Sequence, residues 1–273
     1  MDAAPHSSRV IGPVVAGMFY PAGAEALAAT VTGLLAGAQP SEAGADEPVP
    51  RALIVPHAGL IYSGPVAASA YRLLMPAAAR IRRVVLLGPS HRVPFHGLAV
   101  PESDALATPL GDVVVDPDLK ARALERATVG EADPAHAWEH CLEVQLPFLQ
   151  SVLERFTVLP VIVGECSDRD VLEFLESLPL ESPDTLLVIS SDLSHYHDYT
   201  SARALDTATL GEILRLAPEA LDGERACGYR GIRGLLLWAR GQGMTARVVD
   251  FRNSGDTAGD KTRVVGYAAV AFD

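Results

Sequence analysis

The feature that most constrains the fold of this chain is a series of short, continuous apolar runs separated by segments with helical spacing. Four of the runs are ALIVP, VVLLGP, TVLPVIVG and TLLVISS, and none alternates apolar with polar residues. This continuous pattern is typical of parallel strands that are covered on both faces. We therefore predict an α/β fold, a single domain over 1–273 with a mostly parallel central sheet and helices on both faces. The predicted strands of this sheet are 52–56, 83–89, 157–164 and 185–191.

Segments with helical spacing lie between and after these strands. Pro65 is favourable in a first helical turn, Asp116 is a candidate N-cap, and Pro147 is a possible kink or boundary. Residues 97–115 have short strand signals broken by turns, which we interpret as a hairpin, and 37–50 have the Pro, Gly and acid content of a surface loop. The predicted helices are 25–36, 65–75, 116–127, 141–156, 169–178, 200–216 and 231–241, and the predicted closing strands are 245–252 and 262–272.

Composition and charge exclude several classes of partner. The chain has 34 acidic and 22 basic residues, a formal net charge of −12, and no basic run. Neither nucleic acid nor an anionic membrane surface is therefore an expected partner. No apolar run reaches the roughly 18–20 residues of a membrane span, and the N-terminus does not resemble a signal peptide. Three cysteines without a CxxC spacing indicate a reducing compartment, so we expect a cytoplasmic protein.

Three histidines follow three of the apolar runs. His57 ends VPH, His91 ends LGPSH, and His195 ends SSDLSH. In an open α/β sheet, ligands bind at the carboxyl edge of the strands, and imidazole is the commonest metal ligand and acid–base group. An ordinary hydrogen-bonded turn is the alternative for each histidine taken alone. Because His57 and His91 stand at equivalent strand ends, we favour a shared site.

The loop after 185–191 carries Asp192 together with His195. An aspartate that accepts a ring N–H can orient a histidine as a base or a ligand. The alternative is a helix cap before residue 200. Ser190 and Ser191 raise the possibility of a serine hydrolase, but the chain has no GxSxG motif, which makes this interpretation unfavourable.

Two further segments contain candidate residues. EHCLEVQ carries Glu139, His140 and Glu143 at the start of a predicted helix, where either Glu139 or His140 could reach the site, although acids at a helix start are also common. Cys227 precedes a predicted helix, and a positive helix end would lower its pKa and favour thiolate, a nucleophile or soft ligand. The alternative for Cys227 is a small buried apolar side chain.

Seven strings, in this order, resemble the Memo protein family, whose bacterial and archaeal members are also called AmmeMemoRadiSam system protein B. They are VAGMFYP, VPHAG, LGPSH, EHCLEVQLPFLQ, SSDLSH, ACG and NSGDTAGDKTRVVGYAA, and the resemblance spans 14–272. The resemblance implies a fold similar to the class III extradiol dioxygenases, which are non-haem iron enzymes. It also implies neighbours in bacteria, an AMMECR1-type protein and a radical S-adenosylmethionine enzyme.

The resemblance implies roles for individual residues. His57, His91 and Cys227 would form the metal pocket, His195 would be the acid–base histidine with Asp192 beside it, and Glu139 and His140 would line the pocket. The dioxygenases have a glutamate where this family has the cysteine, which changes redox potential and metal preference. Arg230 stands where the family more often has glycine and would alter the rim of the pocket.

Three functions fit these residues. The first is an O2-dependent oxygenase or oxidase with Fe(II) on His57, His91 and Cys227, acting on a small phenol, enol or hydroxyheteroaromatic substrate. The second is a non-catalytic adaptor that sequesters a redox metal, such as copper or iron, or binds a peptide. The third is a zinc-dependent hydrolase or deaminase.

Overall fold

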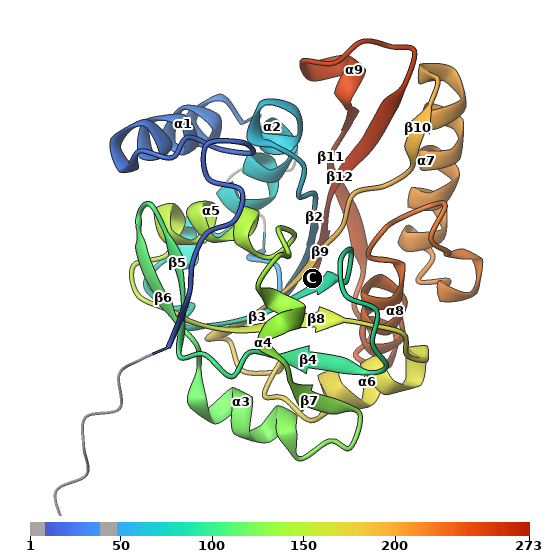
Figure 1. Cartoon of the computed structure of the whole chain (residues 1–273). Coiled ribbons are helices and arrows are strands. Elements are labelled where there is room, and N and C mark those ends of the chain that lie inside the picture. Colours follow the sequence, from blue (N-terminus) through green and yellow to red (C-terminus); the bar gives the residue numbers. More distant parts are fainter. Residues whose placement is uncertain (1–8, 39–47) are drawn as a thin grey trace, which may run out of the picture.

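One mixed sheet forms the centre of the molecule. The computed structural model describes residues 9–38 and 48–273, so most of the predicted 37–50 loop, residues 39–47, lies outside the described part. In the described residues the main sheet has nine strands: β2 (Ala52–Val55), β3 (Arg83–Pro89), β4 (Leu98–Val100), β7 (Val129–Glu131), β8 (Thr157–Val163), β9 (Thr185–Ser190), β10 (His195–His197), β11 (Ala246–Asn253) and β12 (Val264–Phe272). Their order is β10-β12-β2-β9-β3-β8-β4-β7, with β11 paired to β12 (Figure 1).

The four central strands, β2, β9, β3 and β8, are parallel, as their continuous apolar runs predict. Antiparallel neighbours flank them, β12 on one side and β4 on the other. The α/β class is therefore confirmed, and the sheet is mixed toward its edges. Because parallel strands end at a common edge, the residues that follow β2, β9 and β3 lie side by side.

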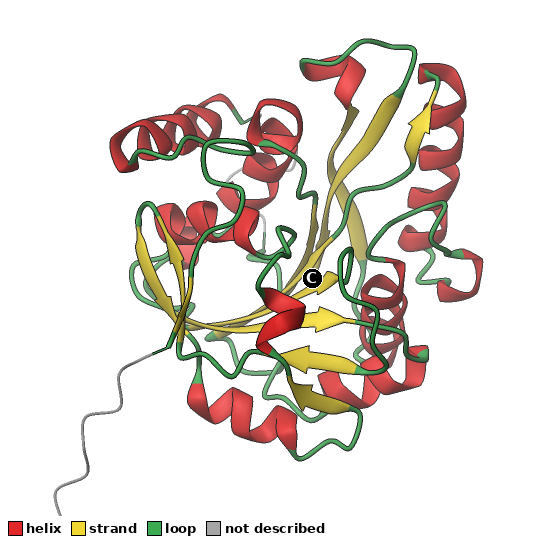
Figure 2. Cartoon of the chain, viewed as in Figure 1, coloured by secondary structure: helices red, strands yellow, loops and turns green. Residues whose placement is uncertain are grey.

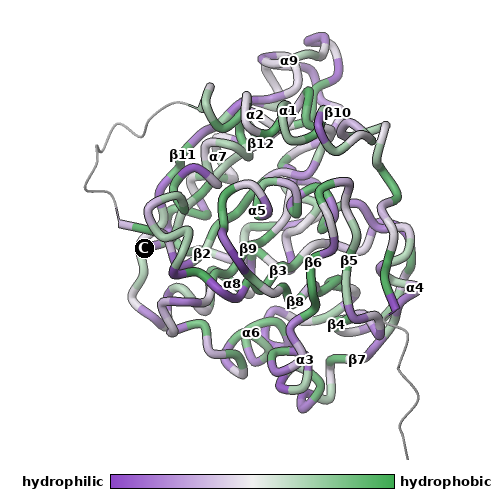
Figure 3. Tube along the Cα trace, turned by 90° about the vertical axis from the view of Figure 1, so that its left-hand side faces the viewer, coloured by the Kyte–Doolittle hydropathy of each residue, from purple (hydrophilic) through white to green (hydrophobic). Residues whose placement is uncertain are grey.

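Helices cover both faces of this sheet (Figure 2). Alternate strand residues enter two separate apolar cores, so that Leu53 and Val55 face one layer while Ala52 and Ile54 face the other. One core contains α1 (Ala24–Gly37), α2 (Leu60–Arg72) and α5 (Leu146–Val152), and the other contains α3 (Pro117–Leu124), α6 (Asp168–Glu176), α7 (Tyr199–Leu214) and α8 (Tyr229–Gly241). Two short helices are α4 (Asp133–His136) and α9 (Ser254–Thr257). Hydrophobic stretches run through the middle of the trace in Figure 3.

A second, three-stranded sheet has the order β1-β5-β6 and consists of β1 (Val10–Ile11), β5 (Ala105–Thr108) and β6 (Gly111–Val114). The antiparallel pair β5–β6 is the hairpin expected within 97–115. Across the helices of residues 9–38 and 48–273, none combines the length and apolarity that a membrane crossing requires.

Two helices differ from their predicted bounds by more than three residues at one end or both. Helix α2 begins at Leu60 rather than at Pro65, which lies inside it. Proline has no N–H, so the carbonyl oxygen of Ile61, four residues earlier, lacks its helical donor. Ile61 is exposed, so water can bind this carbonyl oxygen. The predicted helix 141–156 is instead a 3-10 turn, Glu143–Gln145, followed by α5. Pro147 stands in the first turn of α5, where proline is tolerated.

Candidate metal centre

His57 follows β2 directly, and the register of the parallel strands decides what lies beside it. Val55 pairs with Ser190 of β9, so the residues two positions further on, His57 and Asp192, emerge together at the carboxyl edge. The backbone N–H of His57 donates to Oδ1 of Asp192 at 2.8 Å. The imidazole is almost entirely buried, with 2% of the residue exposed. Its orientation is therefore set by the protein and not by solvent.

His91 follows β3, the strand on the other side of β9. Glu139 holds it with both carboxylate oxygens: the backbone N–H of His91 donates to Oε2 at 2.7 Å, and ring Nδ1 lies 2.8 Å from Oε1. Gly88 in β3 makes this arrangement possible, because a side chain there would collide with Sγ of Cys141 two residues after Glu139.

Cys227 comes from the turn immediately before α8. Its Sγ lies 3.4 Å from Nε2 of His57 and accepts a hydrogen bond from the backbone N–H of Asp192 at 3.3 Å. The next residue, Gly228, packs so closely on β9 that an added Cβ would lie 2.7 Å from Cβ of Ser191. The thiol is therefore brought to the sheet edge by a glycine that lets the turn approach the strand.

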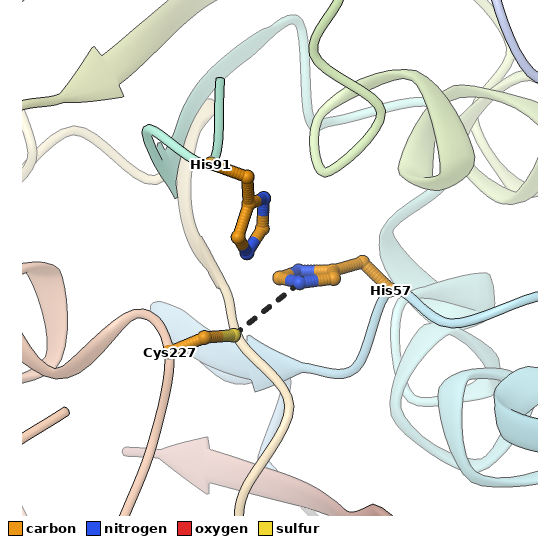
Figure 4. A group of neighbouring side chains, drawn as sticks. All are labelled: His57, His91 and Cys227. Carbon is orange, nitrogen blue, oxygen red and sulfur yellow. Dashed lines mark hydrogen bonds between the residues drawn. The ribbon is translucent and has the colours of Figure 1, made fainter. Parts of the chain in front are cut away.

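These three side chains converge on one point, as Figure 4 shows. One potential ligand atom from each of His57, His91 and Cys227 lies within 4.8 Å of the others, and the two imidazole centroids are 5.3 Å apart. Tetrahedral coordination by nitrogen and sulfur places ligand atoms about 3.5 Å from each other, close to the 3.4 Å between Nε2 and Sγ. Two imidazoles and a thiolate suit iron, copper or zinc, so the residues fit a single transition-metal ion.

The electrostatics of this group favour a neutral histidine and a protonated thiol in the absence of a cation. Burial lowers the pKa of His57 to about 4, and the nearby His91 and His140 act in the same direction, although Asp192 opposes them. Burial also raises the pKa of Cys227 to about 12, reinforced by the charge of Asp192. The expectation that the start of α8 would favour thiolate is therefore wrong, because desolvation outweighs the hydrogen bonds from Asp192 and Gly228.

Glu139 and His140 lie beside the three side chains. The His140 ring is 5.0 Å from that of His91 and 5.4 Å from that of His57, and Glu139 Oε1 is 3.2 Å from His140 Nδ1. Burial alone would raise the pKa of Glu139, but hydrogen bonds from both histidines hold it well below its usual range. Glu139 is thus a buried carboxylate that orients two imidazoles.

A second grouping, His91 with Glu139 and Cys141, also has its potential ligand atoms close together. It is the poorer metal site. The Cys141 thiol is fully buried and donates to the carbonyl oxygen of Pro89 at 3.3 Å, and burial raises its pKa well above the usual value. The carboxylate of Glu139 is already occupied by His91 and His140.

Asp192 and His195 both line the large cleft beside the metal ligands, but they are not paired as predicted. Asp192 accepts from the backbone of His57, and within residues 9–38 and 48–273 no hydrogen bond joins it to His195. The backbone of His195 begins β10 and pairs with Val265 of β12, whereas Asp192 follows the end of β9. His195 is half-buried at the cleft wall.

The cleft has a volume of about 840 Å³ and aromatic as well as charged walls. Phe19, Tyr62 and Tyr267 contribute rings, and Arg92 and Arg263 contribute cations. Arg230 and Cys227 both line a separate pocket of about 240 Å³, and the Arg230 guanidinium lies over the ring of Tyr229.

The sequence did not indicate two buried polar residues behind the site. Gln145 and Tyr71 are fully buried and connect to His57 through Ser190, which the sequence presented only as a candidate nucleophile. The polar Gln145 between the apolar Val144 and Leu146 was the available signal, because a buried amide requires partners.

Comparisons with known proteins agree over nearly the whole chain. A family model described as Memo-like protein matches residues 12–271. A protein of Aquifex aeolicus named MEMO1 family protein is 38% identical over 97% of this chain and 99% of its own length. One of Archaeoglobus fulgidus with the same name is 34% identical over 95% of this chain and 98% of its own length.

A solved structure is also similar in its fold. The crystal structure of an uncharacterized protein from Escherichia coli K12 matches with a TM-score of 0.56 and 14% sequence identity. The match covers 80% of this chain and 98% of that chain. At this identity the similarity concerns the fold alone.

Proposed function

This chain belongs to the Memo-like protein family, and we propose that it binds ferrous iron through His57, His91 and Cys227 and carries out an O2-dependent oxidation. The observation that carries the proposal is the convergence of two imidazoles and one thiol beside a cleft large enough for an aromatic molecule. Ligand sets of two histidines and one anion with open positions are typical of non-haem iron oxygenases. The proposed substrate is a small phenol, enol or hydroxyheteroaromatic compound.

When bound, iron supplies the one-electron and O2 chemistry that protein side chains lack. The chain supplies the binding and orientation. His57 and His91 present neutral nitrogens, Cys227 supplies one negative charge after losing its proton, and Asp192 fixes the backbone of His57 through its carboxylate. Thiolate and ferrous iron both persist in a reducing compartment, which supports a cytoplasmic location.

His195 is the proposed acid–base group. It lies in the same cleft as His57 and His91 but belongs to a different strand pair, so it can face the substrate and leave the metal ligands undisturbed. We assign it removal of the substrate hydroxyl proton and the later return of that proton. The rings of Phe19, Tyr62 and Tyr267 offer apolar walls for a planar substrate.

A peptide-binding adaptor is the second candidate, and one observation favours it. Three apolar or aromatic side chains that line the cleft are largely exposed: Met18 at 72%, Ile61 at 70% and Tyr196 at 65%. Exposed apolar groups around a hollow are typical of protein interaction sites. In this alternative the metal serves structure or sequestration and not turnover.

The experiment is O2 uptake by protein purified without air and loaded with Fe(II), with catechols and hydroxyindoles as substrates. We expect uptake that depends on iron and substrate, loss of iron in His57→Ala and Cys227→Ser, and loss of uptake with iron retained in His195→Ala. The matched control is His96→Ala, which changes an exposed histidine outside the cleft.

Other results of this experiment would favour the adaptor or the zinc enzyme over the oxygenase, or would overturn the role of His195. Stoichiometric iron without uptake, together with binding of a defined peptide that Ile61→Asp abolishes, would favour the adaptor. Stoichiometric zinc after expression without added metal would favour a hydrolase or deaminase. Uptake that is equal in the wild type and in His195→Ala would overturn the acid–base assignment.

A further inference from the structure

Behind His57 lies a buried chain of hydrogen bonds that the proposed reaction does not use. Nδ1 of His57 lies 2.9 Å from Oγ of Ser190, and Oγ lies 2.8 Å from the side-chain nitrogen of Gln145. Gln145 Oε1 in turn accepts from the hydroxyl of Tyr71 at 2.8 Å. Ser190, Gln145 and Tyr71 have no solvent exposure, and within residues 9–38 and 48–273 the partners of their polar groups are one another, the His57 ring and the surrounding backbone.

The orientation of the Gln145 amide follows from its neighbours. Its nitrogen lies 3.0 Å from the carbonyl oxygen of Pro56, which can only accept. A flipped amide would place two acceptor oxygens against each other, so the nitrogen must face Pro56 and Ser190. The remaining amide oxygen then accepts from Tyr71. Gln145 therefore donates to Ser190 Oγ.

The proton of the Ser190 hydroxyl is also determined. A serine hydroxyl has one proton to donate and two lone pairs to accept with. Oγ lies 2.6 Å from the carbonyl oxygen of Cys141, again an acceptor only, so the single proton points there. One lone pair takes the hydrogen bond from Gln145. The other lone pair faces His57, and Nδ1 of His57 must therefore carry a hydrogen.

We infer that Ser190, fixed by Gln145, is a positioning residue that holds His57 in the tautomer protonated on Nδ1, so that Nε2 is the metal-binding nitrogen. Nε2 is the ring atom that lies 3.4 Å from Cys227 Sγ. The same assignment excludes Ser190 as a nucleophile activated by His57, because the imidazole donates to this serine and does not accept its proton.

The consequence for metal binding rests on the proposed function, whereas the tautomer is a property of the metal-free protein. Hydrogen-bond partners of a ligating imidazole fix its tautomer and orientation, and their loss typically costs 10–100-fold in metal affinity. Ser190→Ala removes the acceptor and leaves a buried Nδ1–H without a partner. Ser190→Thr keeps the hydroxyl.

The test has two readouts. The first is long-range proton–nitrogen NMR of the imidazoles in metal-free protein near pH 7.5, with His57 assigned by its absence in His57→Gln. We expect a protonated Nδ1 and a bare Nε2 in the wild type, in Ser190→Thr and in Ser69→Ala, a control that removes a buried hydroxyl elsewhere. In Ser190→Ala we expect a mixture of tautomers.

The second readout is Zn(II) affinity measured by competition with a chromophoric chelator. We expect Ser190→Ala to bind about 10–100-fold more weakly, with most of the affinity recovered in Ser190→Thr. A bare Nδ1 in the wild type overturns the inference, as does an unchanged tautomer in Ser190→Ala. The wild-type spectrum decides the question even if Ser190→Ala does not fold. A protonated Nδ1 in a protein that binds no metal would support the inference while overturning the proposed function.

Discussion

His57 and His91 stand at equivalent strand ends, yet the protein supports them in different ways. The ring of His91 faces a carboxylate, Glu139, and that of His57 faces a hydroxyl, Ser190, backed by the amide of Gln145. Glu139, the charged support, and Ser190, the neutral support, each accept a hydrogen bond from an Nδ1–H and thereby direct Nε2 toward the metal pocket. Only the carboxylate adds negative charge, which raises the basicity of its histidine as a ligand.

The difference follows from where each support lies. Glu139 precedes the 3-10 turn and receives hydrogen bonds from backbone groups of His91 and His140 as well as from their rings, so its charge is well compensated. Ser190 lies in the central strand β9, where a carboxylate would be next to the buried Asp192. Two such charges without a cation between them would be costly, and a neutral hydroxyl avoids that cost.

The largest expected effect comes from breaking the charged support. In Glu139→Gln an amide nitrogen would face the backbone N–H of His91, now bound to Oε2 at 2.7 Å. We expect metal affinity to fall toward the upper end of the 10–100-fold range and the free energy of unfolding to fall by about 1–3 kcal/mol. Metal titration and urea denaturation measure both, with the exposed Glu165→Gln as control. Equal behaviour of the two variants would contradict the role of Glu139.

The pH dependence of stability should also distinguish the charged support, Glu139, from the neutral support, Ser190. The pKa of Glu139 lies well below its usual range in the folded protein, so its contribution to stability is fully present above about pH 4.3 and is lost as pH falls below that value. Denaturation between pH 3 and 7 should therefore show a smaller acid-induced loss of stability in Glu139→Gln than in the wild type. An identical loss would mean that the carboxylate is not held ionised by its partners.

Removing the hydrogen bond from Gln145 to the neutral support should lower metal affinity less than Glu139→Gln does. It should also leave the acid dependence of stability unchanged. Gln145→Leu removes the donor to Ser190 and leaves the Tyr71 hydroxyl without its acceptor. We expect about tenfold weaker metal binding and about 1–3 kcal/mol lower stability, with the acid dependence of the wild type retained. Gln150→Leu, an amide outside the site, is the control. A changed acid dependence would show that the two supports are not independent.

Metal affinity itself should rise with pH. The pKa of Cys227 is raised to about 12 and that of His57 is lowered to about 4, so near neutral pH the thiol has a proton to lose while His57 has none. One released proton corresponds to about a tenfold gain in affinity for each pH unit between 7 and 9. Competition titrations across this range measure the slope, and an affinity independent of pH would contradict thiolate ligation.

The smallest effect is expected at Arg230, which lines the smaller pocket with Cys227 and not the cleft that His57 and His91 line. Arg230→Gly should leave metal affinity within about twofold of the wild type, as for substitutions that touch no ligand. A larger change in the chelator competition would mean that the smaller pocket behind Cys227 influences the metal after all.

The sequence predicted the parts of the site that depend on strand ends. Continuous apolar runs indicate parallel strands, and parallel strands bring His57 and His91 to one edge. It did not predict the support of His57, because Gln145 and Ser190 are 45 positions apart and meet only in the folded core. Two predictions were wrong for a related reason: the hydrogen bond between Asp192 and His195, and the thiolate state of Cys227. Local motifs do not show the path of a loop or the depth at which a thiol is buried.

We propose that His57, His91 and Cys227 bind one metal ion together, and X-ray absorption at the metal edge of anaerobically loaded protein can show this directly. We expect one sulfur neighbour at about 2.3 Å, as in metal–thiolate bonds, accompanied by histidine nitrogens, and loss of the sulfur in Cys227→Ser. A spectrum with only nitrogen and oxygen neighbours in the wild-type protein would contradict it.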